Sequence, residues 1–171
     1  PIGRIVEVLG NYADPGMEIE IALRKHDLPF EFPKKALEET KELPDKVKKS
    51  EWEGREDLRD LPLVTIDGET AKDFDDAVWA EKQGKDWRLV VAIADVAHYV
   101  RPGGQLDREA RKRGNSVYFP DRVVPMLPEV LSADVCSLKE GEPRTAMACH
   151  MTISEDGHIT AWRFTRAIVQ I

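Results

Sequence analysis

The sequence lacks the features that mark several common classes of protein. It has only two cysteines, Cys136 and Cys149, and their spacing fits neither a CxxC metal motif nor a disulfide framework. No apolar run approaches the ~18 residues of a membrane-spanning helix, and no signal-peptide pattern opens the chain. We therefore expect two buried thiols in a reducing compartment, a cytoplasmic location and no membrane partner.

Positive charge is scarce as well. Lysine and arginine number 25 against 32 aspartate and glutamate residues, which gives a net charge of −7. Taken alone, this negative net charge argues against general electrostatic binding to the phosphate backbone of nucleic acids. The 171 residues are 42% apolar, which supports a globular protein with a real core, formed as one domain or as one domain plus a fragment.

Both ends of the sequence run through a strand pattern without a cap or a tail. The chain opens on "PIGRIVEVLG" and closes on "AWRFTRAIVQI". We therefore expect a segment of a longer protein, so that part of any function inferred here belongs to the parent protein.

Local signals in the first third of the chain are weak. Residues 4–9 favour a short strand, whereas "MEIEIALRKH" (17–26) fits either a strand or a helix. Pro33 suits the first position of a helix that Pro44 ends, because a helix start leaves its N–H groups unpaired and proline has none. The highly charged stretch 45–61 predicts a linker or an exposed helix.

Strand patterns dominate from residue 61 onward. We expect strands at 61–66, 76–82, 87–100 (covered on both faces) and 116–120, a helix at 105–114, and a hairpin over 144–171 with its turn at Asp156-Gly157. The helix is supported by opposite charges four residues apart, and Gly114 suits its C-terminal cap. The predicted class is α+β, with a mixed, mostly antiparallel sheet and short helices.

Negative charge is crowded into one short stretch after residue 66. This acidic cluster consists of Asp67, Asp73, Asp75 and Asp76, together with Glu69. Lys72 is the single cation in the same stretch. Close carboxylates repel and raise one another's pKa, so water, hydrogen bonds or a metal cation must absorb the charge. A solvated loop is one interpretation, because aspartate favours turns and helix starts. A packed loop that holds a hard cation is the other, since apolar patterns flank the cluster and Phe74 lies inside it.

The spacing of these aspartates argues against a calcium-binding EF-hand. Counting from Asp67 or from Asp73 places alanine at the fifth ligand position and no glycine at the sixth. An open site for Mg²⁺ fits better, because Mg²⁺ keeps water and substrate phosphate oxygens among its ligands. Sites of this kind hydrolyse phosphodiesters.

The chain resembles one enzyme family over residues 55–171. The segments that carry the resemblance are "DLRDLPLVTIDGETAKDFDDAVW", "LVVAIADVAHYV", "GNSVYFPDRVVPMLPEVLS" and "CSL". They resemble the first half of the catalytic RNB domain of the ribonuclease II and ribonuclease R family, with the ribonuclease R branch as the nearer match. Residues 1–10 resemble the last strand of the cold-shock (OB-like) domain that precedes it, and 11–54 would connect the two.

This resemblance implies a processive 3′-to-5′ exoribonuclease. Such an enzyme hydrolyses single-stranded RNA to nucleoside 5′-monophosphates with Mg²⁺, for which Mn²⁺ can substitute. Asp67, Asp73 and Asp76 resemble the metal-holding carboxylates of the family, and Asp75 resembles the aspartate of the chemical step, which would orient the attacking water. Tyr118 in "VYFP" resembles the tyrosine that stacks on the 3′-terminal base, a platform worth ~1–3 kcal/mol per base.

Other side chains have weaker signals. Arg122 follows the presumed base platform and is a candidate for contact with RNA, whereas the cations of helix 105–114 are more simply explained by the helix dipole and their acidic partners. Phe119 alternates in direction with Tyr118 on a strand, so we expect Phe119 in the core. Three residues on strand patterns are predicted to pack in the interior: Trp79, Trp87 and Trp162.

The resemblance also implies parts that lie outside this chain. The family's catalytic arginine, a second stacking aromatic and the S1 RNA-binding domain would lie beyond Ile171. We therefore expect the chain alone to have little or no exonuclease activity on the 3′ end of single-stranded RNA. Its cut sheet could form a non-native dimer by pairing or swapping strands. The alternative function is a non-catalytic interaction module with a solvated acidic loop.

Overall fold

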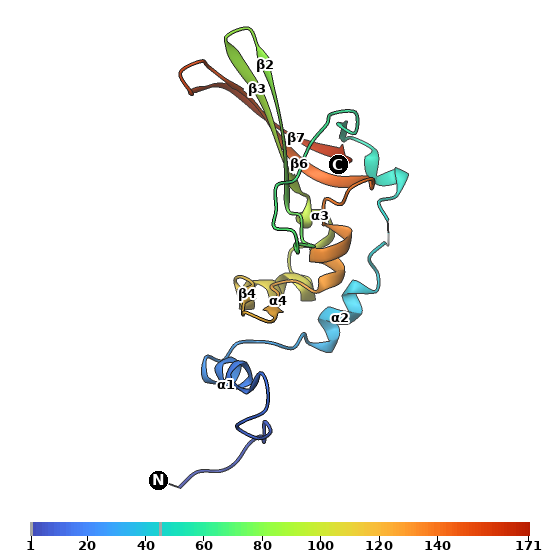
Figure 1. Ribbon diagram of the computed structural model, residues 1–171. Coiled ribbons are helices and arrows are strands. Elements are labelled where there is room, and N and C mark those ends of the chain that lie inside the picture. Colours follow the sequence, from blue (N-terminus) through green and yellow to red (C-terminus); the bar gives the residue numbers. More distant parts are fainter. Residues whose placement is uncertain (1, 45) are drawn as a thin grey trace.

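Four long antiparallel strands dominate the computed structural model, which describes residues 2–44 and 46–171 (Figure 1). A short fifth strand joins them in parallel, and the strand order is β1-β7-β6-β3-β2. The strands are β1 (Glu56–Asp57), β2 (Asp76–Gln83), β3 (Asp86–Ala94), β6 (Arg144–Ile153) and β7 (Ile159–Val169). The sheet is mixed and mostly antiparallel, as predicted.

Two hairpins build the sheet and extend together away from the helices (Figure 1). Strands β2 and β3 pair up to Gln83 and Asp86, so the turn consists of Gly84 and Lys85. Gly84 has φ +65°, a left-handed conformation that costs glycine little. The chain turns between β6 and β7 at Asp156-Gly157, which confirms the predicted hairpin.

Short helices and a small second sheet complete the α+β fold. The helices are α1 (Met17–Lys25), α2 (Lys34–Thr40), α3 (Val96–Tyr99) and α4 (Gln105–Arg113), with a 3-10 turn η1 (Lys49–Trp52) and a π-helical turn η2 (Leu131–Val135). The second sheet pairs β4 (Val117–Tyr118) with β5 (Val123–Val124). Across residues 2–44 and 46–171, no helix has both the length and the apolar character needed to cross a bilayer.

Helix α4 confirms the expectation for residues 105–114. Its predicted charge pairs form, with 3.0 Å between Arg111 Nε and Asp107 Oδ1 and 3.1 Å between Arg113 Nε and Glu109 Oε1. The ambiguous stretch 17–26 is a helix over Met17–Lys25, in which Met17 and Leu23 are buried. Helix α2 begins just after Pro33, which occupies the cap position rather than the first helical position.

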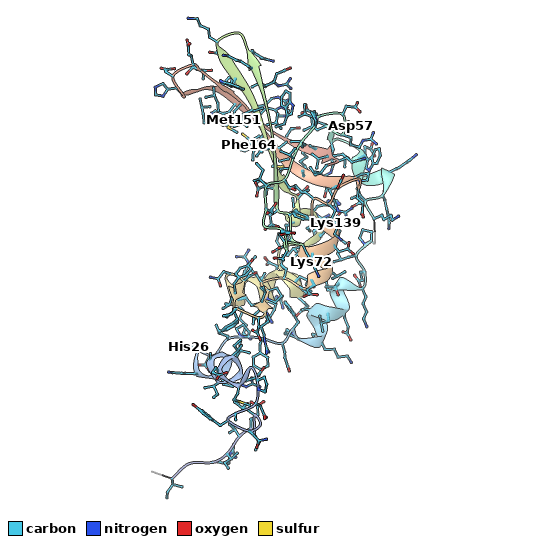
Figure 2. All side chains as sticks on the ribbon, viewed as in Figure 1. His26, Asp57, Lys72, Lys139, Met151 and Phe164 are labelled. Carbon is cyan, nitrogen blue, oxygen red and sulfur yellow. The ribbon has the colours of Figure 1, made fainter. Side chains whose placement is uncertain are left out.

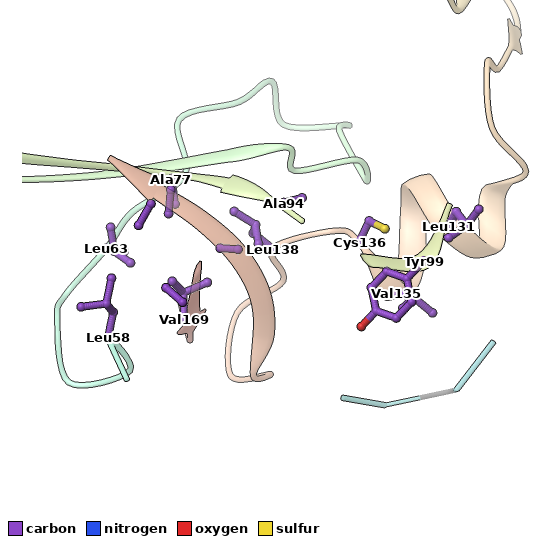
Figure 3. Close-up of a cluster of buried hydrophobic side chains, with 14 of the residues drawn as sticks. Leu58, Leu63, Ala77, Ala94, Tyr99, Leu131, Val135, Cys136, Leu138 and Val169 are labelled. Atoms are coloured by element: carbon purple, nitrogen blue, oxygen red, sulfur yellow. The ribbon is translucent and has the colours of Figure 1, made fainter. Parts of the chain in front are cut away.

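The core lies on one face of the large sheet, where the strands carry small side chains (Figure 3). The strand register places six buried alanines on this face: Ala77, Ala92, Ala94, Ala146, Ala148 and Ala167. Their size allows Leu58, Leu63 and Leu138 to pack directly on the strands. The same cluster continues through Tyr99, Leu131, Val135 and Cys136 toward η2.

The opposite face of the sheet is open along the described part of the chain. Phe164 and Met151 project from this side of the β6–β7 hairpin (Figure 2). The prediction that 87–100 is covered on both faces is wrong, since Trp87 and Ile93 on β3 are 44% and 46% exposed. The interior position predicted for Trp162 is also wrong, because its side chain lies on this open face with 67% of its surface exposed.

Two predicted strands do not form. Residues 4–9 have no strand partner within the described residues, and Ile5, Val6 and Val8 are 81–85% exposed. Residues 61–66 make a single bridge, between Val64 and Val78. A strand exists only when a neighbour pairs with its N–H and C=O groups, and an apolar pattern alone does not provide that neighbour. Pro1 and Asp45, which belong to the predicted segments 1–10 and 45–61, lie outside the described residues.

Candidate metal and RNA site

The four aspartates lie on one loop that leads into the edge strand β2. This acidic loop (residues 65–76) starts beyond the Val64–Val78 bridge and ends at Asp76, the first residue of β2. Asp67, Asp75 and Asp76 are exposed, and Asp73 is partly buried. The loop is therefore open to solvent on the side that carries its carboxylates.

The second half of the acidic loop is fixed to the rest of the domain by hydrogen bonds. The Ser137 hydroxyl donates to the Lys72 carbonyl at 2.8 Å and accepts from the Phe74 N–H at 3.1 Å. The N–H of Leu138 donates to the Phe74 carbonyl at 2.9 Å, and the N–H of Ala94 donates to the Asp75 carbonyl at 2.9 Å. The interpretation of a packed loop, rather than a loose one, fits these bonds and the contact of Phe74 with the core.

The negative charge of the loop is not neutralised by protein groups. Across residues 2–44 and 46–171, none of the four carboxylates forms an ion pair or accepts a hydrogen bond. The pKa of Asp75 is raised above its usual 3.8, first because surrounding protein restricts hydration of the carboxylate and then because Asp73, Asp76 and Asp67 repel its charge. The four aspartates thus act on one another electrostatically.

The donor set fits a hard divalent cation in its chemistry. Carboxylate oxygens are the protein ligands that Mg²⁺ prefers, and Mg²⁺ retains several waters. Within the described chain, no group of three or more His, Cys, Asp or Glu side chains has already converged on a common point. The exposed aspartates can reach a common ion only by changing rotamer, which side chains at an open surface do readily.

Tyr118 lies beside the aspartates. It lines a hollow of about 330 Å³ together with Asp73 and Asp75, and an adjacent hollow of about 380 Å³ together with Asp73 and Arg122. Its side chain is exposed, and the neighbouring Phe119 is partly buried. The structure therefore brings the predicted base platform and two of the predicted carboxylates around the same space.

The thiol of Cys136 also lines the first hollow. Burial, followed by the charges of Asp75 and Asp95, raises the pKa of this thiol to about 12. It is therefore protonated at neutral pH, and a metal binds the thiolate form of cysteine. Oxygen ligands are the donors that this site offers.

Arg122 already has partners in the protein. Its guanidinium lies 2.9 Å from Glu20 of α1 and 3.5 Å from Asp121, and these carboxylates raise the pKa of Arg122. This side chain joins α1 to the β4–β5 sheet, so contact with RNA would compete with Glu20. Its predicted role in RNA binding stays a prediction.

Two protein families match parts of this chain. Residues 55–171 match the RNB domain family. The chain belongs to the RNB family. Residues 1–33 match the cold shock domain family, a match that extends past residue 10 and includes α1.

Individual members of the RNB family match nearly the whole chain. Ribonuclease R of Escherichia coli (strain K12) is 54% identical over 169 residues, which are 98% of this chain and 21% of the relative. Mycoplasma genitalium RNase R, solved in complex with double-stranded RNA, superposes with a TM-score of 0.91 at 35% identity, covering 96% of this chain and 29% of the other. The chain thus spans about a fifth of the length of the curated relative.

The fold also occurs in a protein with a different description. Yeast Ssd1, a pseudonuclease, superposes with a TM-score of 0.75 at 22% identity, covering 95% of this chain and 21% of the other. A shared fold does not imply a shared function, so the function of this chain is inferred from the side chains of its acidic loop.

Ser137 was not singled out by sequence reasoning. A lone serine has no pattern of its own, and its contacts with the acidic loop join residues more than 60 positions apart. The signal was the segment "CSL" (136–138), which belongs to the resemblance. Nothing in that segment indicated which residue contacts the loop.

Proposed function

We propose that this chain is the metal-holding part of a processive 3′-to-5′ exoribonuclease. The complete protein would hydrolyse single-stranded RNA to nucleoside 5′-monophosphates. The observation that carries the proposal is the acidic loop of an RNB-family chain, with four uncompensated aspartates, of which Asp73 and Asp75 line a hollow together with the exposed Tyr118.

Each residue has a role in this proposal. Asp67, Asp73 and Asp76 hold Mg²⁺, or Mn²⁺ in its place, and the bound cation supplies charge stabilisation and an activated water for phosphodiester cleavage. Asp75 orients the attacking water and, with a pKa raised above its usual value, can accept the proton of that water. The ring of Tyr118 stacks on the terminal base without reading its identity, which suits a degradative enzyme.

The remaining parts of the parent protein supply what this chain lacks. The E. coli relative is almost five times as long as the matched region, which leaves room for the rest of the RNB domain and for cold-shock and S1 domains. We infer that a catalytic arginine, a second stacking aromatic and most of the basic RNA channel come from those parts. A net charge of −7 on this segment is compatible with RNA binding by the complete parent protein.

A non-catalytic interaction module is the second candidate function. The described carboxylates have not converged on a common point, as expected of a solvated loop. Under this alternative the loop would bind neither Mg²⁺ nor Mn²⁺.

The test is hydrolysis of RNA by the full-length protein that contains this chain. Single-stranded RNA is incubated with Mg²⁺, and nucleoside 5′-monophosphates are separated by chromatography. We expect mononucleotides from the wild type, none with excess EDTA, and at least a 100-fold lower rate for Asp75→Asn, the usual contribution of acid–base catalysis. Asp86→Asn, at the far end of β3, is the matched control. Equal rates for Asp75→Asn and wild type would exclude the proposed role.

A further inference from the structure

Ser137 is a polar residue with no exposed surface, between η2 and β6. A buried hydroxyl is costly unless both its donor and acceptor capacities are used. Both are used here, and both by the backbone of the acidic loop, at Lys72 and Phe74. The hydroxyl thus holds the backbone on both sides of Asp73, the residue between Lys72 and Phe74.

The position of Ser137 is itself fixed from the other side. Its N–H donates to the Asp134 carbonyl at 3.1 Å. Its carbonyl accepts from Arg144 Nε at 2.8 Å, and Arg144 is 2% exposed and lies 2.8 Å from Glu142. The backbone of Ser137 is therefore held by η2 and β6, and its hydroxyl holds the loop.

Two of the four hydrogen bonds that join the backbone of residues 72–75 to other described segments come from this one side chain. On the N-terminal side, the nearest pairing of the backbone with another described segment is the Val64–Val78 bridge. The turn bond from the Ala71 N–H to the Gly68 carbonyl lies within the loop and fixes nothing outside it. Between that turn and the strand pairing of β2, the contacts from Ser137, Leu138 and Ala94 hold the backbone.

We propose that Ser137 is a positioning residue for cation binding: its hydroxyl holds the backbone on both sides of Asp73 so that Asp73 can share one divalent cation with Asp67 and Asp76. This inference rests on the proposed function of the acidic loop. Ser137 touches neither RNA nor the cation in this proposal. Groups that orient metal ligands typically change metal affinity by 10–100-fold when they are removed.

The experiment compares four forms of the 171-residue chain. Mn²⁺ is titrated and free Mn²⁺ is followed by electron paramagnetic resonance, with Mg²⁺ as a competitor. Ser137→Ala removes only the oxygen and should weaken Mn²⁺ binding at least tenfold. Ser137→Thr keeps a hydroxyl, so its Mn²⁺ affinity should stay within about threefold of the wild-type value. A tenfold change in affinity corresponds to ~1.4 kcal/mol. Ile168→Val, at a fully buried site on β7, controls for a general loss of stability.

A second readout separates this inference from the proposed function. Hydrogen exchange at the Phe74 amide reports the bond to the serine directly, with or without a metal. Exchange should be at least tenfold faster in Ser137→Ala than in wild type or Ile168→Val, as expected when an amide loses its hydrogen-bond acceptor.

The outcomes are distinct. Wild-type Mn²⁺ affinity in Ser137→Ala would overturn the positioning role. If the wild type binds no Mn²⁺, the proposed function fails, and the Phe74 amide then decides: unchanged exchange in Ser137→Ala overturns the inference, and faster exchange retains Ser137 as the anchor of the loop.

Discussion

At the scale of single residues, the ionised side chain of Asp75 destabilises the folded chain. Burial, and after it the charges of Asp73, Asp76 and Asp67, disfavour the ionised form of Asp75 in the folded chain and so raise its pKa. A group whose pKa is higher in the folded state than in the unfolded state favours folding at low pH and opposes it above the raised pKa. The site thus keeps a destabilising charge that a bound cation would offset.

Asp75→Asn should therefore stabilise the metal-free chain at pH 7. We expect a gain of a few tenths to about 1 kcal/mol, kept small because solvent screens exposed charges. The gain should vanish below about pH 3.8, the usual pKa of this group, where Asp75 is protonated in both states. Thermal unfolding of wild type and variant between pH 3 and 8 measures the effect. A variant less stable than wild type at pH 7 would contradict it.

Tyr118 is the other residue whose role can be isolated. In full-length protein made inactive by Asp75→Asn, Tyr118→Ala should weaken binding of a short single-stranded RNA by about 1–3 kcal/mol, and Tyr118→Phe should leave it unchanged because the stacking ring remains. Fluorescence anisotropy with labelled RNA measures both. The matched control is Trp162→Ala, which removes an exposed aromatic from the open sheet face. Equal losses for Tyr118→Ala and Trp162→Ala would refute a specific base platform.

Single residues were predictable where sequence neighbours carry the signal. The four aspartates lie within ten residues of one another, so their proximity follows from the chain itself. The hydrogen bonds between Ser137 and the loop, and between Arg122 and Glu20, join distant positions of the sequence. No local pattern specifies such partners, and only the folded structure shows that Arg122 is already engaged.

A buried ion pair joins different elements of the fold. Arg55 Nη2 lies 2.7 Å from Asp95 Oδ2, with side-chain exposures of 1% and 9%. Arg55 precedes β1 and Asp95 follows β3, so the pair holds the charged segment 46–55 against the sheet. Arg166 of β7 lies 3.4 Å from the same carboxylate.

Asp95→Ala should destabilise the chain by about 3–5 kcal/mol, because it leaves the buried Arg55 charge without its main partner. Urea unfolding measures the loss, and the double variant Arg55→Leu/Asp95→Leu should recover much of it. As a control, Glu155→Gln removes an exposed pair with Lys85 and should cost less than about 0.5 kcal/mol. A cost below 1 kcal/mol for Asp95→Ala would show that solvent reaches this pair.

Elements were predictable where local chemistry is sufficient. Helix α4 has paired charges and a glycine cap, and the β6–β7 hairpin has a turn signal between two strand patterns. The strands expected at 4–9 and 61–66 depend on partners that no local pattern provides. The two-residue strand β1 was missed for the same reason, because its pairing with β7 joins residues over 100 positions apart.

The whole molecule has one covered sheet face and one open face. Trp162, Phe164, Met147 and Ile93 are exposed on the open face, and apolar patches of this kind mark sites of interaction. The open edge strands and this face are consistent with the predicted dimer of the isolated chain, which stays a prediction. The fold class and the family were predictable from sequence because the matched segments span most of the chain, whereas the open face was not, since apolar residues alone do not reveal what covers them.

The isolated chain should be a poor enzyme. Under the proposed function the arginine, the second aromatic and the RNA channel belong to other parts of the parent protein, so this chain alone would supply only part of the charge stabilisation of the scissile phosphate. We expect mononucleotide release from 5′-labelled single-stranded RNA to be at least 1,000-fold slower than with the full-length protein under the same Mg²⁺ conditions, a loss typical of removing one stabilising group or more. Release at a rate near that of the full-length protein would contradict this division of labour.

Cation binding by the acidic loop is the most direct measurement of the central claim. Mn²⁺ is titrated into the 171-residue chain by calorimetry and compared for wild type, Asp67→Asn, Asp76→Asn and the remote control Asp86→Asn. We predict one site in the wild type and in Asp86→Asn, competed by Mg²⁺, and at least tenfold weaker binding in the two loop variants, because each loses a charged ligand. No binding by the wild type, or equal affinity in all four proteins, would contradict a metal site on this loop.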